Sequence, residues 1–303
     1  KMIHYVKRED LEVAKYNDCI ENSIQSRIYA FSWYLDIVAD NWDVLVLNDY
    51  EAVMPVPFRR KFGINYVYPP LWMIELGVFS KYKNVRSDDF ILVLQTNFKF
   101  VELRLNTHNS VDKFKKKSIK RYLQFLPLKD DYDTIFKKYN RNRKREIAKA
   151  KKFNLVENWN DNPQKLIQLF KENIANRLGK VNQQDFDNLL QLINLCLEKN
   201  VGDLLTIYSD KKELVSAAFF IKHKNKVTQV VCASDLKNRD NGANTFSNDC
   251  AIFRYQKHFD IYNFGGSSIK SIAKYYKSYG AETEEYYQIK YNNLPYLLKL
   301  FKK

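Results

Sequence analysis

The chain has 303 residues, of which 45% are hydrophobic and 15% aromatic, and its formal net charge at pH 7 is +15. This length exceeds what one hydrophobic core usually serves, so two domains or one large domain are expected, and the apolar content excludes global disorder. The charge leaves two interpretations open. It reflects either a solvated lysine-rich surface or an anionic partner such as RNA, a phosphate-bearing cofactor or a membrane surface.

Cysteine and histidine usage argues against a metal enzyme and against disulfides. No Cys-x-x-Cys pair or Cys/His cluster occurs, and buried reduced thiols are expected at Cys19, Cys196, Cys232 and Cys250. No apolar run approaches the roughly 18 residues of a membrane helix, and the first residues lack the apolar segment of a signal peptide. We therefore expect a cytoplasmic protein without metal, membrane span or disulfide-linked partner.

The first third of the chain predicts a helix followed by a small sheet. Apolar side chains recur at helical spacing within residues 23–38, at Ile24, Ile28, Phe31, Leu35 and Val38. Three short apolar runs separated by polar turns follow, at residues 43–47, 52–58 and 64–68. Runs of this length and spacing are typical of an antiparallel meander. An apolar run at 90–95 and an alternating strand at 98–105 continue this half of the chain.

Two basic clusters lie near the middle of the chain. Residues 113–121 hold six basic side chains and no acid, and residues 137–152 hold nine against the single Glu146. We expect one helix from Asp130 and Asp131, whose acids suit its positive end, to about Lys152. Arg141, Arg145, Lys149 and Lys152 form a stripe on it at helical spacing. Arginine suits bidentate contact with phosphate, so the stripe is either a phosphate-binding surface or solvated.

The stretch from residue 201 onward has the most regular pattern. An amphipathic helix at 186–198 precedes three short strands at 204–208, 214–221 and 227–233. A polar loop, a helix carrying Phe246, Cys250 and Phe253, a strand at 260–264, a glycine turn, a helix at 269–277 and a strand at 286–291 follow. The same helix-plus-meander layout occurs at 23–68. We therefore predict a mixed α/β fold of two similar halves, 1–127 and 128–303.

Three segments resemble those of a known superfamily. The order of elements from residue 201 onward resembles a GNAT-type acyltransferase domain, and the whole chain resembles the duplicated Fem-type (FemAB-like) aminoacyl transferases. Residues 141–152 are similar to the basic helix that opens the second half of those proteins. Residues 262–267 resemble their strand with a glycine-rich end, and residues 272–281 resemble their tail of aromatic, Lys, aromatic and Gly.

The resemblance implies two tandem GNAT-like halves and an acyltransferase that uses no covalent enzyme intermediate. The donor would be acyl-CoA or aminoacyl-tRNA, and the acceptor an amine of a small molecule, peptide or cell-wall precursor. The tail has one residue fewer between Lys277 and Tyr279 than is usual, and no heptad pair predicts a coiled-coil arm. These two features favour acyl-CoA. An aminoacyl-tRNA-dependent peptidyltransferase and a non-catalytic, nucleic-acid-binding GNAT-like protein are the alternatives.

Candidate site residues follow from position in this layout. Donor phosphates need backbone N–H groups at a helix N-terminus, which points to Arg239, Asn241, Gly242 and Ala243. The resemblance adds the strand end, glycine turn and tail, with Asn263, Gly265, Gly266, Ser267 and Lys277. As catalytic acid or base we consider Asp235, which ends the third strand, and Tyr275 and Tyr276, because GNAT-like enzymes often place a tyrosine near the leaving sulfur. For Asp235 and for each tyrosine a purely structural role is the alternative, and for the junction at 238–244 the alternative is an ordinary capped helix. Phosphate contacts of tRNA would involve Arg141, Arg145 and Lys149.

Overall fold

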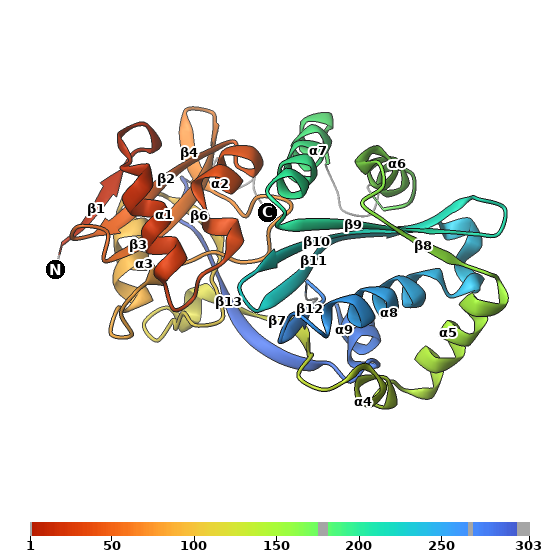
Figure 1. Ribbon diagram of the computed structural model, residues 1–303. Helices are drawn as coiled ribbons and strands as arrows, with labels where there is room; N and C mark the ends of the chain where they lie inside the picture. The colour runs from red at the N-terminus through yellow and green to blue at the C-terminus, as the bar shows by residue number, and fades with distance from the viewer. Residues whose placement is uncertain (1, 175–180, 266–268, 296–303) are drawn as a thin grey trace. The chain divides into compact units, whose positions relative to one another are not determined.

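The computed structural model describes residues 2–174, 181–265 and 269–295, and the chain divides into two compact units (Figure 1). Unit 1 comprises Lys1–Arg121 and Glu285–Lys303, and unit 2 comprises Tyr122–Glu284. The division expected after residue 127 falls at the end of strand β7 (Ser118–Pro127), and the residues from Glu285 onward group with unit 1.

Unit 1 is a mixed sheet with helices. Its strands are β1 (Ile3–Val6), β2 (Asn41–Leu47), β3 (Ala52–Lys61), β4 (Ile64–Val67), β6 (Phe100–Arg104) and the end of β13 (Glu282–Asn292), in that order across the sheet. The short β5 (Phe79–Ser80) pairs with β3. The helices are α1 (Val13–Asn22), α2 (Ser32–Val38), α3 (Ser87–Asn97) and the short η1 (Arg8–Asp10), η2 (Ile28–Ala30) and η3 (Lys115–Lys117). The meander expected at 43–68 is therefore confirmed as β2, β3 and β4.

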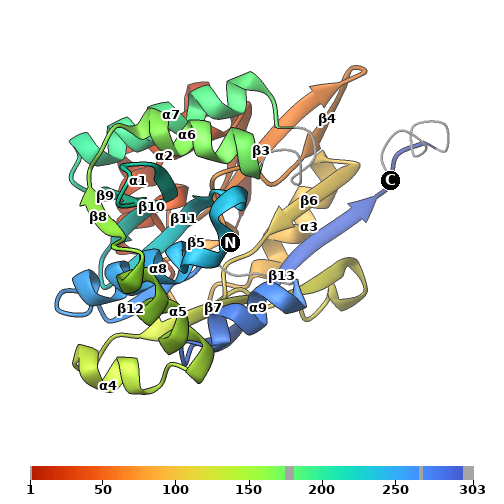
Figure 2. The ribbon, with the colours of Figure 1, turned by 90° about the vertical axis from the view of Figure 1, so that its right-hand side faces the viewer.

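Unit 2 is a second mixed sheet with helices on both faces. Across it the strands run β7, β12 (Ile261–Asn263), β11 (Lys226–Ser234), β10 (Leu214–His223), β9 (Gly202–Tyr208) and β8 (Val156–Trp159). Helices α6 (Pro163–Asn173) and α7 (Gln183–Glu198) cover one face of β9–β11, and α8 (Ala243–Tyr255) covers the other (Figures 1 and 2). On the α8 side lie α5 (Arg141–Lys152) and α9 (Lys270–Lys277). The expected second meander is confirmed as β9, β10 and β11.

The two long strands that follow β6 and β12 pair outside their own half of the sequence. Strand β7 follows β6 along the chain, yet its residues Phe125–Pro127 pair antiparallel with β12. Strand β13 follows β12, yet its residues Gln288–Asn292 pair antiparallel with β6. Each half therefore supplies one strand to the sheet of the other.

One predicted helix is two helices in the structure. The segment expected to run continuously to Lys152 consists of α4 (Tyr132–Lys137) and α5, with a break at residues 138–140. At the break Tyr139 is buried, and the Asn140 side chain accepts a hydrogen bond from the N–H of Arg143 at 3.0 Å. An asparagine at this position starts a new helix because it satisfies a free N–H group of the first turn. The helix expected at 23–38 is likewise shorter, comprising η2 and α2.

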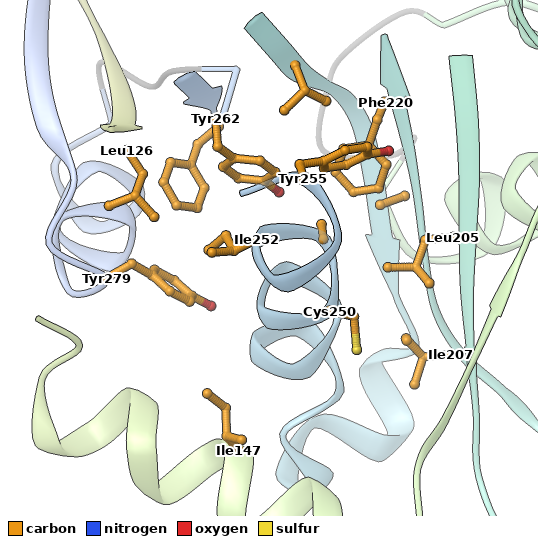
Figure 3. Packing of buried hydrophobic residues seen from close by; sticks show 14 of the residues in the cluster. Leu126, Ile147, Leu205, Ile207, Phe220, Cys250, Ile252, Tyr255, Tyr262 and Tyr279 are labelled. Carbon is orange, nitrogen blue, oxygen red and sulfur yellow. The ribbon is translucent and has the colours of Figure 1, made fainter. Parts of the chain in front are cut away.

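The core of unit 2 forms around α8. Ile252, Tyr255 and Cys250 of this helix pack between Ile147 of α5 and the sheet residues Leu205 and Phe220 (Figure 3). Phe220 also contacts the rings of Tyr255 and Tyr262, with centroids 5.6 and 6.1 Å apart. Because α8 is in contact with both α5 and the sheet, its position is fixed from two sides.

Three of the four cysteines are buried thiols as expected, whereas the expectation of burial was wrong for Cys232. Cys19, Cys196 and Cys250 are buried free thiols, and Cys232 is a free thiol that is partly exposed. Within residues 2–174, 181–265 and 269–295, no helix has the length and apolar character needed to cross a membrane. In the same ranges no group of three or more His, Cys, Asp or Glu residues could hold a metal ion.

Candidate active site

Strand β12 is short and pairs over its whole length with only the first residues of β11, after which the two strands are no longer paired in the described residues. Their parallel pairing covers Lys226–Thr228 opposite Ile261–Asn263, whereas the pairing of β11 with β10 continues to Ser234. A β-bulge lies at the point of separation, since Gln229 and Val231 face consecutive residues of β10 and leave Val230 as an extra residue. A bulge bends its strand and can end pairing on one side. Beyond the bulge no described strand pairs with this edge of β11, and the edge faces an opening.

A cavity of about 410 Å³ lies at this opening. Strand β11 contributes Cys232, Ala233 and Ser234, and the first turn of α8 contributes the residues from Ala243 to Thr245. The remaining walls come from the short helix η5 (Leu236–Asn241), from α5 and α9, from Val215 of β10 and from Ile174, which follows α6. The cavity thus combines the backbone edge of a strand with the N-terminus of a helix, where N–H groups lack intrahelical partners.

Gly242 allows α8 to begin directly against α5. Its φ is +78°, and a Cβ added there would lie 2.3 Å from the carbonyl oxygen of Glu146. Only glycine combines a left-handed backbone with such a close approach to another main chain at low cost. The Asn241 side chain accepts a hydrogen bond from the N–H of Ala243 at 2.8 Å, while Gly242 supplies no side-chain cap. Among the described residues, the N–H groups of Asn244 and Thr245 have no acceptor, so they can bind a ligand.

A buried arginine and a carboxylate of α5 meet the first turn of α8. Arg143 is 6% exposed, and its Nη1 lies 3.1 Å from Oε2 of Glu146 and donates to Oγ1 of Thr245 at 2.9 Å. The Thr245 hydroxyl donates in turn to the same Glu146 oxygen. The Arg143 guanidinium also lies 4.4 Å from the ring centroid of Tyr275. These contacts form a charged cluster on the cavity wall.

Tyr275 is the tyrosine that reaches the cavity. Its hydroxyl accepts from Nδ2 of Asn244 at 3.0 Å and lies 2.7 Å from the hydroxyl of the buried Tyr279. Burial raises the pKa of Tyr275, although hydrogen bonds to Thr245 and Tyr279 and the Arg143 charge oppose the increase. At neutral pH the phenol therefore keeps its proton and can act as a donor, never as a base.

Several residues singled out from the sequence line the cavity. Asp235 follows β11 directly and caps η5, its carboxylate accepting from the N–H of Lys237 at 2.9 Å. Asn241, Gly242 and Ala243 form the junction between η5 and α8. With Tyr275, these residues meet at one cavity although they lie on three different elements.

Other predicted residues lie elsewhere or outside the described parts. Tyr276 stacks on Phe264, with ring centroids 4.7 Å apart, and Asn263 is buried with its side chain accepting from the N–H of Gly265 at 2.9 Å. Neither Asn263, Gly265, Tyr276 nor the exposed Lys277 is among the described residues that line the cavity. Gly266, Ser267 and the side chain of Arg239 lie outside what the structure describes.

The basic stripe lies on a different side of α5 from the cavity. Arg141, Arg145 and Lys149 are exposed, whereas Arg143 and Glu146 of the same helix line the cavity. Arg143 and Glu146 received no role from the sequence. The available signal was spacing, because Arg143 precedes the buried Ile147 and Ala150 by one and two helical turns and so belongs to the apolar side of the helix.

The fold has known counterparts. No protein-family model matches the sequence, and no curated protein matches it. Among solved structures, FemX aligns over all of both chains with a TM-score of 0.69 and 10% identity. The C-terminal domain (DUF2156) of a putative lysylphosphatidylglycerol synthetase from Agrobacterium fabrum aligns over 95% of this chain and 94% of its own, with a TM-score of 0.58 and 9% identity. A tandem GNAT protein from the clavulanic acid biosynthesis pathway aligns over 97% and 99%, with a TM-score of 0.56 and 10% identity.

These similarities define the architecture. The chain has the duplicated GNAT-like fold of FemX and of the tandem GNAT protein, so the predicted mixed α/β class is confirmed and the resemblance to Fem-type proteins holds at the level of the fold. At identities of 9–10% these comparisons carry no residue-by-residue equivalence. The function must therefore be argued from the cavity itself.

Proposed function

We propose that the chain transfers an acyl group from an acyl-CoA to the amine of a small molecule or peptide. The observation that carries this proposal is the cavity of unit 2, which combines the open edge of β11 with the N-terminus of α8, where Gly242 supplies no side-chain cap. A thioester with a phosphate-bearing arm needs both features. Helix N–H groups bind phosphate oxygens, and strand N–H groups orient a carbonyl and stabilise its oxyanion.

The residues of the cavity suit direct transfer. A neutral amine attacks the thioester carbonyl, and the tetrahedral oxyanion that forms is stabilised by N–H groups of β11 beyond the bulge. Asp235, on the cavity wall at the end of β11, would accept the proton that the amine loses. The Tyr275 hydroxyl, kept protonated by burial, would donate a proton to the departing thiolate. No step requires a covalent bond to the enzyme or a metal.

Cys232 offers a direct test of donor binding. All four cysteines lie in the described residues, and Cys232 alone is partly exposed and lines the cavity. Burial raises its pKa to about 11, so labelling with a maleimide should be slow and is best measured above pH 8. We expect saturating acetyl-CoA to slow the labelling of Cys232, located by mass spectrometry. Cys232→Ser serves as the unlabelled control, and CoA binding without protection would place the donor elsewhere.

A second candidate donor is aminoacyl-tRNA, which would make the chain a peptidyltransferase on a precursor such as a cell-wall peptide. The observation that favours it is the stripe of Arg141, Arg145 and Lys149. These side chains are exposed, and no carboxylate in the described ranges pairs with them. Free guanidinium groups on one helix face suit contacts with a phosphate backbone.

Neutralising the stripe separates the two donors. If tRNA is bound, the triple change to glutamine should weaken binding and flatten its salt dependence by roughly 0.7–0.9 for each phosphate that the variant no longer neutralises. If acyl-CoA is the donor, the same variant should keep its CoA affinity. Salt-sensitive RNA binding without turnover of any charged donor would instead indicate a non-catalytic RNA-binding protein.

A further inference from the structure

The N-terminus of α8 contains a carboxylate that belongs to the chain itself. Glu146 reaches from α5 to the first turn of α8, where its Oε2 accepts from the Thr245 hydroxyl and pairs with Arg143. The Glu146 side chain is 35% exposed and forms part of the cavity wall. It therefore occupies the positive end of a helix, where an anionic ligand group would also bind most favourably.

The position of Glu146 is fixed by the backbone. The close approach of Gly242 to the carbonyl of Glu146 holds α5 and α8 together at this residue. Since both helices are packed into the core of unit 2, the carboxylate cannot leave by a movement of its helix. It can leave the first turn of α8 by rotation of its side chain toward the open cavity.

Arg143 has one N–H group that its described neighbours leave without an acceptor. The side chain is 6% exposed and lines the cavity, and its Nε has no hydrogen-bond partner among the described residues. Its Nη1 is shared between Glu146 and Thr245. A buried guanidinium with an unsatisfied donor is costly unless a further acceptor arrives. A phosphate group offers more acceptor oxygens than one carboxylate and matches the planar guanidinium.

We propose that Glu146 is a resident anion that the phosphate group of the ligand must displace. The inference rests on the proposed function, in that the phosphate is taken to be part of the acyl donor. Glu146 thereby selects for strongly anionic ligands, because a weak anion gains too little from Arg143, Thr245 and the α8 amides to replace a carboxylate already bound there. A ligand ammonium group is disfavoured at this point because Arg143 already neutralises Glu146 and the helix end is positive.

The test is removal of the negative charge at residue 146. Glu146→Gln keeps an acceptor oxygen and the side-chain length for the contacts with Thr245 and Arg143. Glu146→Ala removes the carboxylate and the rest of the side chain beyond Cβ. Glu198→Gln is the matched control, since Glu198 is exposed at the end of α7 and is not among the residues lining the cavity. Binding of inorganic pyrophosphate and of CoA is measured by calorimetry for all four proteins at one salt concentration.

We expect both variants at residue 146 to bind pyrophosphate and CoA about tenfold tighter than the parent, the scale of one like-charge contact in a half-buried setting. Glu198→Gln should bind like the parent. Unchanged or weaker binding in both variants at residue 146 overturns the inference.

The two proposals fail in different ways. Parent protein that binds CoA, together with variants that bind it no tighter, removes the role of Glu146 and leaves the proposed donor intact. Tighter pyrophosphate binding by the variants, with no CoA binding by any protein, keeps the resident anion and removes acyl-CoA as the donor.

Discussion

Gly242→Ala is the change for which the structure gives the sharpest expectation. The residue has a φ of +78°, and alanine in a left-handed backbone costs about 1–2 kcal/mol. The new Cβ would lie 2.3 Å from the oxygen and 3.1 Å from the carbon of the Glu146 carbonyl. Both are main-chain atoms of a packed helix, so relief requires α5 and α8 to separate, at a typical overpacking cost of about 1–3 kcal/mol. The expected total decrease in the free energy of unfolding is about 2–5 kcal/mol.

Gly63→Ala supplies the matched control. Gly63 has nearly the same φ, +76°, but an added Cβ meets no described atom within 4 Å. Its free energy of unfolding should fall only by the conformational part, about 1–2 kcal/mol. Denaturant unfolding followed by circular dichroism gives the two decreases, and hydrogen exchange assigns each to its unit. Equal decreases in the two variants would refute the close packing of α5 on α8, and with it the fixed position of Glu146.

Three further expectations concern stability. Burial raises the pKa of Asp249, so the stability that this group contributes is present at low pH and is lost as pH rises from about 3.9 through the raised pKa. Asp249→Asn keeps an acceptor for the Tyr132 hydroxyl and should therefore raise the Tm at pH 7. At Asp161 burial alone would raise the pKa, but hydrogen bonds from Tyr208 and Lys165 outweigh burial and lower the pKa to about 2. The Tm deficit of Asp161→Asn at pH 6 should therefore shrink as pH falls from about 4 toward 2. Phe220→Ala should cost about 3–5 kcal/mol in denaturant unfolding, because Phe220 is fully buried; a cost below about 1 kcal/mol would contradict the described core.

Part of the candidate site was accessible from the sequence. The order strand, polar loop, helix placed Asp235, Asn241, Gly242 and Ala243 at one junction, and the structure lines the cavity with them. The four residues lie together because they are close in sequence and the junction is formed by local turn chemistry. Tyr275 was singled out together with Tyr276, and the helix geometry alone could not show which of two adjacent tyrosines turns toward the cavity.

The charged partners of that junction could not be found in the same way. Arg143 and Thr245 are separated by 102 positions in the chain, and their contact depends on the packing of α5 against α8. Glu146 sits in a segment so rich in lysine and arginine that composition indicates only a basic surface. Which of these charges is buried is decided by the neighbouring helix.

Local periodicity determined the two meanders, the amphipathic helices and the mixed α/β class, because the alternation of apolar residues along a strand or helix is a property of neighbouring positions. The exchange of β7 and β13 between the halves was decided by tertiary structure alone. The sequence of a strand does not by itself specify which strand lies next to it, because its N–H and C=O groups can pair with any strand edge of suitable register. The same holds for the cavity, which is formed where β11 continues beyond the end of β12 and meets the helices α5, α8 and α9 from separate parts of the chain.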